Sequence, residues 1–291
     1  MAQPAVMLGM ALPDVDRWSE RVVVALGQNP GAFTGPGTNT YLVGTGRERI
    51  LLDTGQGLPA YLPVLERALA EAGEARIGEI VLTHGHPDHL GGVRGIRERH
   101  GALRVSKRPW PAMDAAMGCK IREIDDGAVI AVEGATLRAV HTPGHAEDHL
   151  CFVLEEEGAI FSGDNVLGVG TTVIPAQGGD LALYLRSLER LRAERPGAIY
   201  PAHGPRIADG MAKLREYLEH RLAREREILA ALADGLASVP ALVRRIYAAY
   251  PEALHAAAGS SVASHLKKLR NEGRAVQEGS ADPLEARWRL A

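Results

Sequence analysis

Aromatic residues are scarce in this 291-residue chain, at 4% of the sequence. Proteins that bind single-stranded nucleic acids usually stack bases on aromatic rings, so the chain offers few candidate platforms for such stacking. Phe33, Trp110 and Tyr184 are the rings we consider available for it. A nucleic-acid-binding role therefore has to be argued from other features.

Cysteine is nearly absent too. Cys119 and Cys151 are too few to form a disulfide framework, which suits a reducing compartment. The apolar stretch at residues 5–12 has no basic residue before it, and it is too short to span a membrane. We therefore expect a cytoplasmic protein that makes no contact with a membrane.

The charge is nearly balanced but unevenly distributed. The formal net charge is −3, although residues 211–291 hold 13 Lys and Arg against 10 Asp and Glu. The preceding part is correspondingly acidic. This distribution does not exclude an anionic substrate, but it predicts no basic groove either.

Residues 1–208 alternate strand-like and helical patterns and are predicted to form one domain. Apolar runs at 22–26, 40–43, 49–52 and 77–82 indicate strands. Leucines spaced three and four apart predict an amphipathic helix over 58–72, and a second helix is expected over 181–194. The pattern suits two packed sheets flanked by helices, a fold of the α/β (α+β) class.

Residues 209–291 are predicted to form a second, mainly helical domain. A long helix is expected over 209–233, with Asp209 as its cap and the buried side marked by Leu214, Leu218, Leu222 and Leu229. Short helices over 239–249 and 261–272 precede two strand-like runs at 274–278 and 286–290. This order resembles a helix–turn–helix followed by a β-wing.

Basic residues gather on or just after the last predicted helix, where a recognition helix would lie: Lys267, Lys268, Arg270 and Arg274. They form either a solvated face of a domain that packs on the core, which we favour, or a surface that binds nucleic acid. Leu266 and Leu269, between them, are expected to be buried.

Four possible metal ligands lie close together in residues 83–92, which read Thr-His-Gly-His-Pro-Asp-His-Leu-Gly-Gly. They are His84, His86, Asp88 and His89. Imidazole and carboxylate are the ligand types that zinc takes when no thiolate is available. The run follows a predicted strand and precedes a predicted helix, so its side chains would be held on a rigid sheet.

Three further candidates follow apolar runs downstream. His145, Asp164 and His203 each lie in a short segment rich in glycine or proline, after strand-like residues at 135–140, 159–161 and 198–200. Two neighbouring histidines, His141 and His149, could contact the substrate or a ligand residue, or could simply be hydrogen-bonded loop residues.

This ordered set of motifs resembles the metallo-β-lactamase superfamily over roughly residues 20–205. The resemblance implies a four-layer αββα sandwich in which His84, His86 and His145 hold a first metal. Asp88, His89 and His203 would hold a second metal, and Asp164 would bridge both. Asp53, in the run Leu-Leu-Asp-Thr-Gly at 51–55, would be a structural carboxylate that orients a loop or a ligand histidine.

A narrower resemblance points to the β-lactamase-like-protein-2 branch. It rests on residues 29–34, 37–44 and 141–149 together with the winged-helix-like tail. That branch implies endoribonuclease action on single strands. Class B β-lactamases usually have a cysteine where this chain has Asp164, so we expect at most weak β-lactamase activity.

We therefore predict a binuclear zinc hydrolase whose metal-bridged hydroxide attacks a phosphodiester of single-stranded RNA, with Mn or Fe as possible substitutes for zinc. Asp88 would orient the nucleophile or take its proton, and His149 or His141 would assist the leaving group. The alternative is a small-molecule ester, thioester or lactone hydrolase similar to glyoxalase II. A shared fold does not determine the substrate, so the choice between these two hydrolases stays open. A third and less favoured hypothesis is a non-enzymatic regulator that binds nucleic acid.

Overall fold

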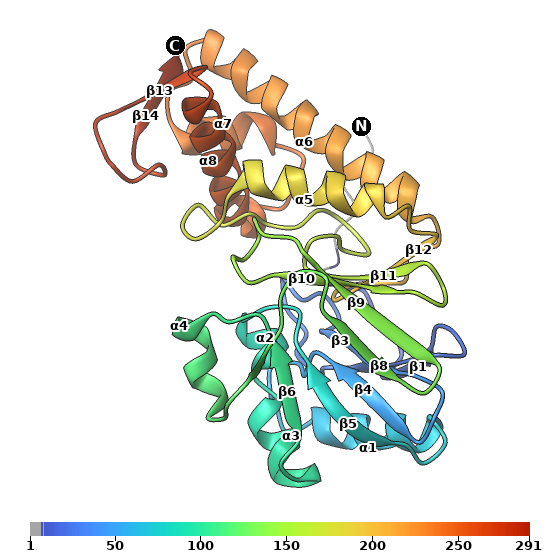
Figure 1. The fold of residues 1–291 in the computed structure, drawn as a ribbon. Helices are drawn as coiled ribbons and strands as arrows, with labels where there is room; N and C mark the ends of the chain where they lie inside the picture. The colour runs from blue at the N-terminus through green and yellow to red at the C-terminus, as the bar shows by residue number, and fades with distance from the viewer. Residues whose placement is uncertain (1–6, 8) are drawn as a thin grey trace.

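The computed structural model describes residue 7 and residues 9–291, so the apolar stretch at 5–12 lies partly outside the described residues. Two β-sheets face each other and are covered by helices on their outer sides (Figure 1). Within the described part of the chain, no helix is long and apolar enough to cross a membrane.

The first sheet has seven strands in chain order, β1 to β7. Strands β1 to β4 pair antiparallel, and β4 to β7 pair parallel. The strands are β1 (Val15–Arg17), β2 (Val22–Leu26), β3 (Asn39–Val43), β4 (Glu48–Leu52), β5 (Arg76–Val81), β6 (Arg104–Lys107) and β7 (Arg122–Glu123). The four strands expected from apolar runs in this region are present as β2 to β5.

The second sheet has five strands in the order β12-β11-β10-β9-β8. Only β11 and β12 run parallel, with α5 between them in the chain. The strands are β8 (Val129–Val132), β9 (Ala135–His141), β10 (Leu150–Leu154), β11 (Ala159–Gly163) and β12 (Ala198–Pro201). Their inward side chains meet those of the first sheet in a core that includes Tyr41, Phe152 and Phe161.

Helices cover the outer faces of both sheets. The apolar side of α1 (Tyr61–Glu71) and part of α3 (Val93–His100) pack on the first sheet. On the second sheet lie α5 (Leu181–Ala193) and the first half of α6 (Gly210–Ala233). The predicted αββα order is therefore confirmed. The short helices are α2 (Pro87–Leu90), α4 (Pro111–Asp114) and η1 (Ala115–Met117).

A separate apolar core lies in the C-terminal part, around the buried indole of Trp288. It is built from the second half of α6 together with α7 (Val239–Ile246), η2 (Glu252–Leu254), α8 (His255–Asn271), β13 (Ala275–Glu278) and β14 (Arg287–Leu290). Leu266 and Leu269 are fully buried there, as predicted. The domain boundary between 208 and 209 stays a prediction, since α6 contributes to both cores.

The structure corrects two features of the predicted C-terminal helices. Helix α8 begins at His255 rather than at 261, because the alanine-rich segment before Ser260 favours helix. On α6, Leu222 is 50% exposed although we expected it to be buried. Arg221 and Glu225 are buried instead, so the buried side of α6 includes charged residues that an apolar pattern cannot reveal.

Candidate metal centre

The loop between β5 and α3 carries the first four candidate ligands. Pro87 begins the four-residue helix α2, since a proline needs no hydrogen-bond partner at the first position of a helix. The extended backbone at His86 and the helical turn that follows direct the side chains before and after Pro87 differently. One short segment can thereby supply ligands to two neighbouring ions.

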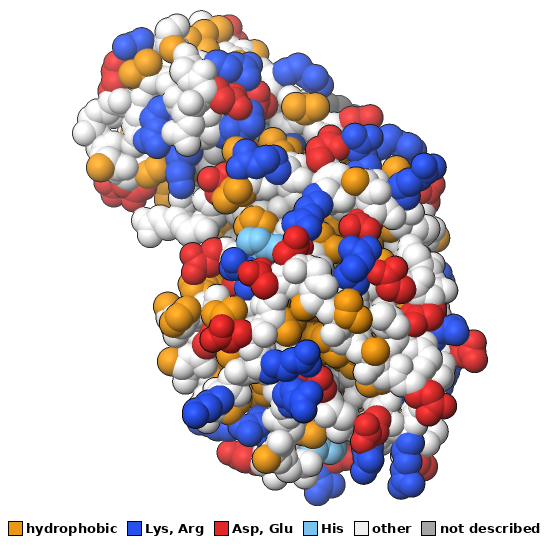
Figure 2. Space-filling view, viewed as in Figure 1, with side chains coloured by type: hydrophobic (Ala, Val, Ile, Leu, Met, Phe, Trp, Pro, Cys, Tyr) orange, Lys and Arg blue, Asp and Glu red, His pale blue; other side chains and the backbone are white. Residues whose placement is uncertain are grey.

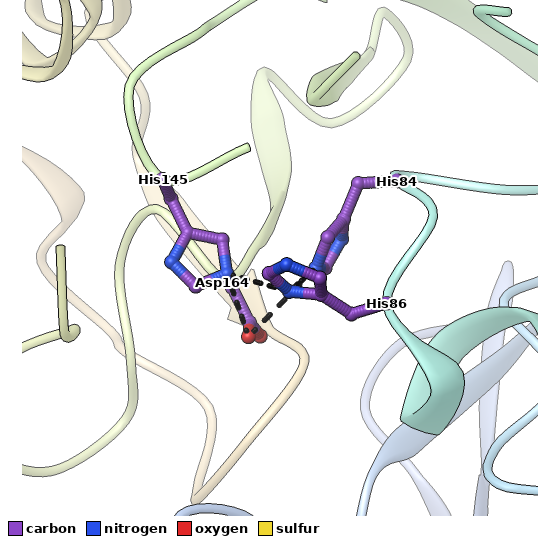
Figure 3. Close-up of side chains that lie close together, drawn as sticks. All are labelled: His84, His86, His145 and Asp164. Atoms are coloured by element: carbon purple, nitrogen blue, oxygen red, sulfur yellow. Dashed lines mark hydrogen bonds and ion pairs between the residues drawn. The ribbon is translucent and has the colours of Figure 1, made fainter. Parts of the chain in front are cut away.

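The first set of donors converges on one point (Figure 3). Nδ1 of His86 lies 2.9 Å from Nε2 of His84 and 3.1 Å from Nε2 of His145. Oδ2 of Asp164 lies 3.4 Å from the same nitrogen of His145. Each residue of the set offers one donor atom, and these atoms all lie within 4.8 Å of one another.

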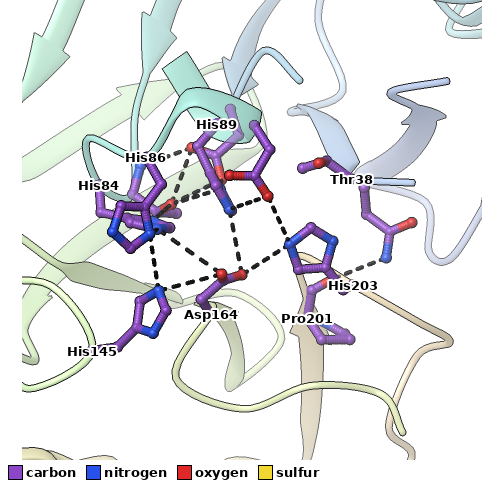
Figure 4. Close-up of polar contacts among 12 residues, drawn as sticks. Thr38, His84, His86, His89, His145, Asp164, Pro201 and His203 are labelled. Atoms are coloured by element: carbon purple, nitrogen blue, oxygen red, sulfur yellow. Dashed lines mark hydrogen bonds and ion pairs between the residues drawn. The ribbon is translucent and has the colours of Figure 1, made fainter. Parts of the chain in front are cut away.

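The second set lies beside the first and shares Asp164 (Figure 4). Nε2 of His203 lies 3.3 Å from Oδ2 of Asp88 and 3.2 Å from Oδ1 of Asp164. Nε2 of His89 lies 3.4 Å from that same oxygen of Asp164. The two carboxylate oxygens of Asp164 thus face different donor sets, which is the arrangement a bridging ligand requires.

The donor chemistry fits divalent metals. Nε2 of His89 and Oδ1 of Asp164 are buried and have no hydrogen-bond partner among the described residues. Buried polar atoms are normally satisfied, so orphaned atoms that face one another indicate a missing partner of opposite chemistry. All seven predicted ligands are brought together, and metal binding by them stays a prediction.

The electrostatics of the two sets differ. Burial holds the pKa of His84 well below its ordinary value, and burial together with nearby His145 lowers the pKa of His86 to about 4. For His203, burial alone would lower the pKa, but the carboxylates of Asp164 and Asp88 raise it to about 9. His84 and His86 therefore present neutral imidazoles, whereas His203 must release a proton to bind a metal.

Asp53 contacts His89, a member of the second donor set, on the side of the ring that faces away from Asp164. Its side chain is buried, accepts hydrogen bonds from the backbone N–H and hydroxyl of Thr83, and lies 2.8 Å from Nδ1 of His89. A proton on Nδ1 directs the free electron pair of Nε2 toward the centre. The structure thus places Asp53 where the sequence predicted an orienting carboxylate.

His149 is fully buried behind the centre. Its Nε2 accepts a hydrogen bond from the backbone N–H of Asp164 at 3.1 Å, and its Nδ1 lies 2.9 Å from the hydroxyl of Thr142. A side chain on Gly163, whose φ is +51°, would come within 2.6 Å of this imidazole. His149 therefore holds the bridging residue in place from behind.

His141 lies elsewhere. Its Nε2 is 3.0 Å from the carbonyl of Glu147, and its backbone N–H donates to Asp126. Among the described residues it is not part of either donor set or of the cavity wall. The structure thus brings His149 to the centre and leaves His141 outside it.

The centre opens into a cavity of about 650 Å³. The predicted ligands His86, Asp88, His145, Asp164 and His203 are part of its lining. The C-terminal part contributes Tyr247, Tyr250, Leu254, Ala257 and Ala258 to the same lining. This part of the lining was not predicted, because most of its residues lie between the short helices expected over 239–249 and 261–272.

A buried charge cluster beneath the loop also escaped prediction. Lys107 is fully buried, and its Nζ lies 2.8 Å from Asp114 and 2.5 Å from Asp148. The carboxylate of Asp148 lies close to Gly85, between the first two ligand histidines. Nothing in the sequence distinguishes these charged residues from others on the surface. Only their contacts in the folded protein show that they support the ligand loop.

The basic residues on and just after α8 are engaged in contacts within the molecule. Lys268 and Arg274 both pair with Glu225 at 2.6 Å, and Lys267 donates to the carbonyl of Ala176. On the face shown in Figure 2, positive and negative side chains are interspersed over both parts of the molecule. Of the rings considered for base stacking, Tyr184 is fully buried. These contacts support the hypothesis that the basic residues belong to a domain that packs on the core, rather than to a surface that binds nucleic acid.

Comparison with family models matches two parts of the chain. Residues 33–203 match the model of the metallo-beta-lactamase superfamily. Residues 238–288 match the model of the beta-lactamase associated winged helix domain. The predicted winged-helix-like tail is thereby confirmed.

Two curated relatives cover most of the chain. The lactamase-like protein adaB of Aspergillus niger is 41% identical over 293 residues, which cover 95% of this chain and 88% of the relative. The atrochrysone carboxyl ACP thioesterase of Aspergillus chevalieri is 45% identical over 250 residues, which cover 83% of this chain and 78% of the relative.

Two solved structures share the fold over nearly the whole chain. A beta-lactamase domain protein from Burkholderia ambifaria matches with a TM-score of 0.82 at 21% identity, covering 97% of this chain and 96% of that one. A metallo-beta-lactamase family protein from Thermus thermophilus matches with a TM-score of 0.76 at 27% identity, covering 94% and 100%.

The prediction of a single-stranded RNA endonuclease is wrong. Relatives 44–45% identical to this chain are named as thioesterases of an ACP-bound acyl group. The prediction rested on the narrower branch resemblance together with the winged-helix-like tail, whereas in the structure the tail lines the cavity beside the candidate metal centre.

Proposed function

Because this chain belongs to the metallo-β-lactamase superfamily and is a metal-dependent hydrolase, we propose that it is a thioesterase that releases a ring-bearing acyl group from an acyl carrier protein. The observation that carries the proposal is the cavity, which joins the metal centre to an apolar wall from the C-terminal part. The names of the thioesterase relatives support the same reaction.

The shape and lining of the cavity favour a flat, apolar acyl group. Tyr247 and Tyr250 lie with their ring centroids 5.2 Å apart, tilted by 59°. Phe33, which is 62% exposed, and Leu167 contribute further apolar surface to the lining. Aromatic side chains prefer offset or edge-on contacts with other rings, so this lining suits a fused ring system better than a short acyl chain.

We propose that two divalent ions, with zinc as the first candidate, are held by the two donor sets that share Asp164. When bound, such ions polarise a carbonyl oxygen and lower the pKa of water toward 7. The residues that fix the ligands are Asp53 behind His89 and the Val173 carbonyl, 2.9 Å from Nδ1 of His145.

Asp88 is the residue placed to move a proton. Its side chain is more exposed than that of Asp164, at 22% against 13%, and it lines the cavity. Its carboxylate is therefore reachable from the cavity by an attacking water and by the sulfur of a leaving thiol. His149, behind Asp164, keeps that carboxylate aligned during the reaction.

The test is hydrolysis of N-acetylcysteamine thioesters of acetate and of 2-naphthoate by the metal-replete protein, followed through the released thiol. We expect turnover of the naphthoyl thioester, and its loss in Asp164→Ala. Tyr250→Ala should raise KM for the naphthoyl substrate about 5-fold and leave the acetyl substrate unchanged, since one ring contact contributes about 1 kcal/mol.

A lactone, a carboxylic ester and a β-lactam run beside the thioesters serve as comparison substrates. Hydrolysis of one of these by a protein that leaves both thioesters intact would contradict the proposal. Thermal unfolding of Asp164→Ala and Tyr250→Ala, measured in parallel, shows whether each variant is folded.

A further inference from the structure

A buried arginine lines the same cavity. Arg221, in the middle of α6, is 2% exposed and belongs to the cavity wall together with His220 and Lys213. An arginine stays charged at any ordinary pH, so a positive charge is held inside the molecule beside the space proposed for the substrate.

The protein satisfies this guanidinium only in part. One terminal nitrogen donates to the carbonyl of Thr172, and the guanidinium carbon lies 5.2 Å from the ring centroid of Tyr184. Its Nε is buried with no hydrogen-bond partner among the described residues. A carbonyl and an aromatic face offset part of the cost of burial, but neither carries a negative charge.

The nearby carboxylates are committed to other cations. Glu225, one turn along α6, pairs with Lys268 and Arg274 at 2.6 Å, and Glu216 pairs with Lys213 at 2.8 Å. Among the residues that the structure describes, Arg221 has no ion-pair partner within 4.0 Å. Arg224 differs in this respect, because its guanidinium forms an ion pair with Glu227 at 2.6 Å.

His220, which also lines the cavity, is polar but uncharged. Burial, together with the charges of Arg221 and Arg224, lowers the pKa of His220 to about 4, so its imidazole is neutral. Its Nδ1 is buried and lacks a partner among the described residues. A ligand that reached this place would meet one guanidinium and one neutral imidazole, beside the ion pair of Lys213 and Glu216 that also lines the cavity.

We infer that Arg221 binds an anionic oxygen group of the thioester substrate, and thereby orients the thioester toward the metal centre. A guanidinium presents a planar fork of donors that matches a carboxylate or a phosphate. The identity of the ligand as part of a thioester rests on the proposed function, whereas the anion site itself rests on Arg221.

The link to the metal centre runs through two consecutive residues. Arg221 donates to the carbonyl of Thr172, and the carbonyl of Val173 lies 2.9 Å from Nδ1 of His145. An anion held by Arg221 is therefore anchored to the same segment that positions a ligand histidine. A substrate fixed at this point and at the metals would be bound at two places.

The anion could come from two parts of an acyl-carrier substrate. One is a carboxylate or ionised phenol on the acyl group, and the other is the phosphate of the carrier's pantetheine arm. Both offer the same chemistry to a guanidinium, so the experiment has an arm for each.

Direct binding is measured first, by calorimetry on the full-length, metal-replete protein with 2-naphthoate and 2-naphthamide. The two compounds share a ring system and differ in charge. We expect Arg221→Gln to reduce the preference for the carboxylate about 10- to 100-fold, as for loss of a charged hydrogen-bonded pair. Glutamine keeps a donor for the Thr172 carbonyl. Arg226→Gln, an exposed arginine on the same helix, is the matched control and should change nothing.

The source of the anion follows from KM values of wild type and Arg221→Gln. One pair of substrates is the 2-naphthoyl and 6-carboxy-2-naphthoyl thioesters of N-acetylcysteamine. The other is the 2-naphthoyl thioesters of pantetheine and of phosphopantetheine. A rise in KM confined to the carboxylated acyl group assigns the site to the acyl moiety, and a rise confined to the phosphorylated arm assigns it to the carrier.

An unchanged carboxylate preference in folded Arg221→Gln would overturn the inference. So would an equal loss of affinity for naphthoate and naphthamide, because that is the behaviour of a purely structural arginine. If Arg221→Gln does not fold, a crystal structure of the wild type with 2-naphthoate decides: a carboxylate bound away from Arg221 refutes the site. Because binding needs no turnover, the anion site can hold even if the thioesterase proposal fails.

Discussion

Replacing Asp53 by asparagine tests how the second metal site is organised. The carboxylate of Asp53 accepts hydrogen bonds from the backbone N–H and hydroxyl of Thr83, and it lies 2.8 Å from Nδ1 of His89. Asparagine keeps the shape and can still accept from the backbone N–H through its oxygen. Its NH2 group then lies next to Nδ1 of His89. This group can only donate a hydrogen bond, whereas the carboxylate oxygen that it replaces accepted one.

The consequence is a change of tautomer at His89. Nδ1 must accept from the new amide, so the proton moves to Nε2, the atom that lies 3.4 Å from Asp164 and 3.6 Å from Asp88. A protonated Nε2 cannot bind a metal. Loss of such an orienting partner typically weakens metal affinity by about 10- to 100-fold, which is about 1.4–2.8 kcal/mol. Because His89 belongs to the second donor set only, one of two metal equivalents should be affected.

The assay is a competition titration of zinc against a chromogenic chelator. Wild type should show two tight equivalents, and Asp53→Asn one tight and one weakened equivalent. Urea unfolding in excess chelator measures the stability of the metal-free protein separately. Asp126→Asn, which removes an exposed carboxylate paired with Arg190, is the matched control and should keep both equivalents. Two tight equivalents in folded Asp53→Asn would show that the tautomer argument is incorrect.

Two further substitutions probe the scaffold around the centre. Lys107→Met leaves the carboxylates of Asp114 and Asp148 without their buried cation, so the free energy of unfolding in urea should fall by about 3–5 kcal/mol; a loss below 1 kcal/mol would contradict the bracing role. Gly144→Ala would place a Cβ 2.4 Å from the backbone of α5, at a φ of +130°, and should cost about 1–3 kcal/mol and weaken the first metal equivalent in the zinc titration. Gly95→Ala, where the Cβ meets open space on α3, should leave both measurements within 1 kcal/mol of wild type, and a loss there as large as at Gly144 would refute the steric explanation.

The local features of the fold were predictable because short-range patterns produce them. Seven strands, β2 to β5, β9, β11 and β12, follow the apolar runs from which they were predicted, and Asp209 caps α6 by accepting from the backbone N–H of Ala212 as expected. The order of the candidate ligands was equally visible, because each one follows a strand-like run. Seven residues of the right chemistry after four strand ends leave little freedom in how a sandwich of two sheets can arrange them.

The buried side of α6 could not be predicted from the local pattern alone. A pattern of leucines placed Leu222 inside, but the buried side includes Arg221 and Glu225. A charged residue can be buried only if distant groups compensate it, and Lys268 and Arg274 do so for Glu225. Those partners lie more than 40 positions away, beyond the reach of any helical periodicity.

By itself, therefore, the sequence determined the superfamily, the layered fold and the set of candidate metal ligands. Tertiary structure decided what lies beside those side chains: the C-terminal part lines the cavity with Tyr247 and Tyr250, and Arg221 adds a charge that has no ion-pair partner among the described residues. The physical reason is that ligand residues follow from chemistry and local spacing, whereas a cavity is formed by segments that meet only after the chain has folded. Substrate choice depends on that cavity, which is why the branch resemblance and the tail predicted an RNA substrate that the comparisons do not support.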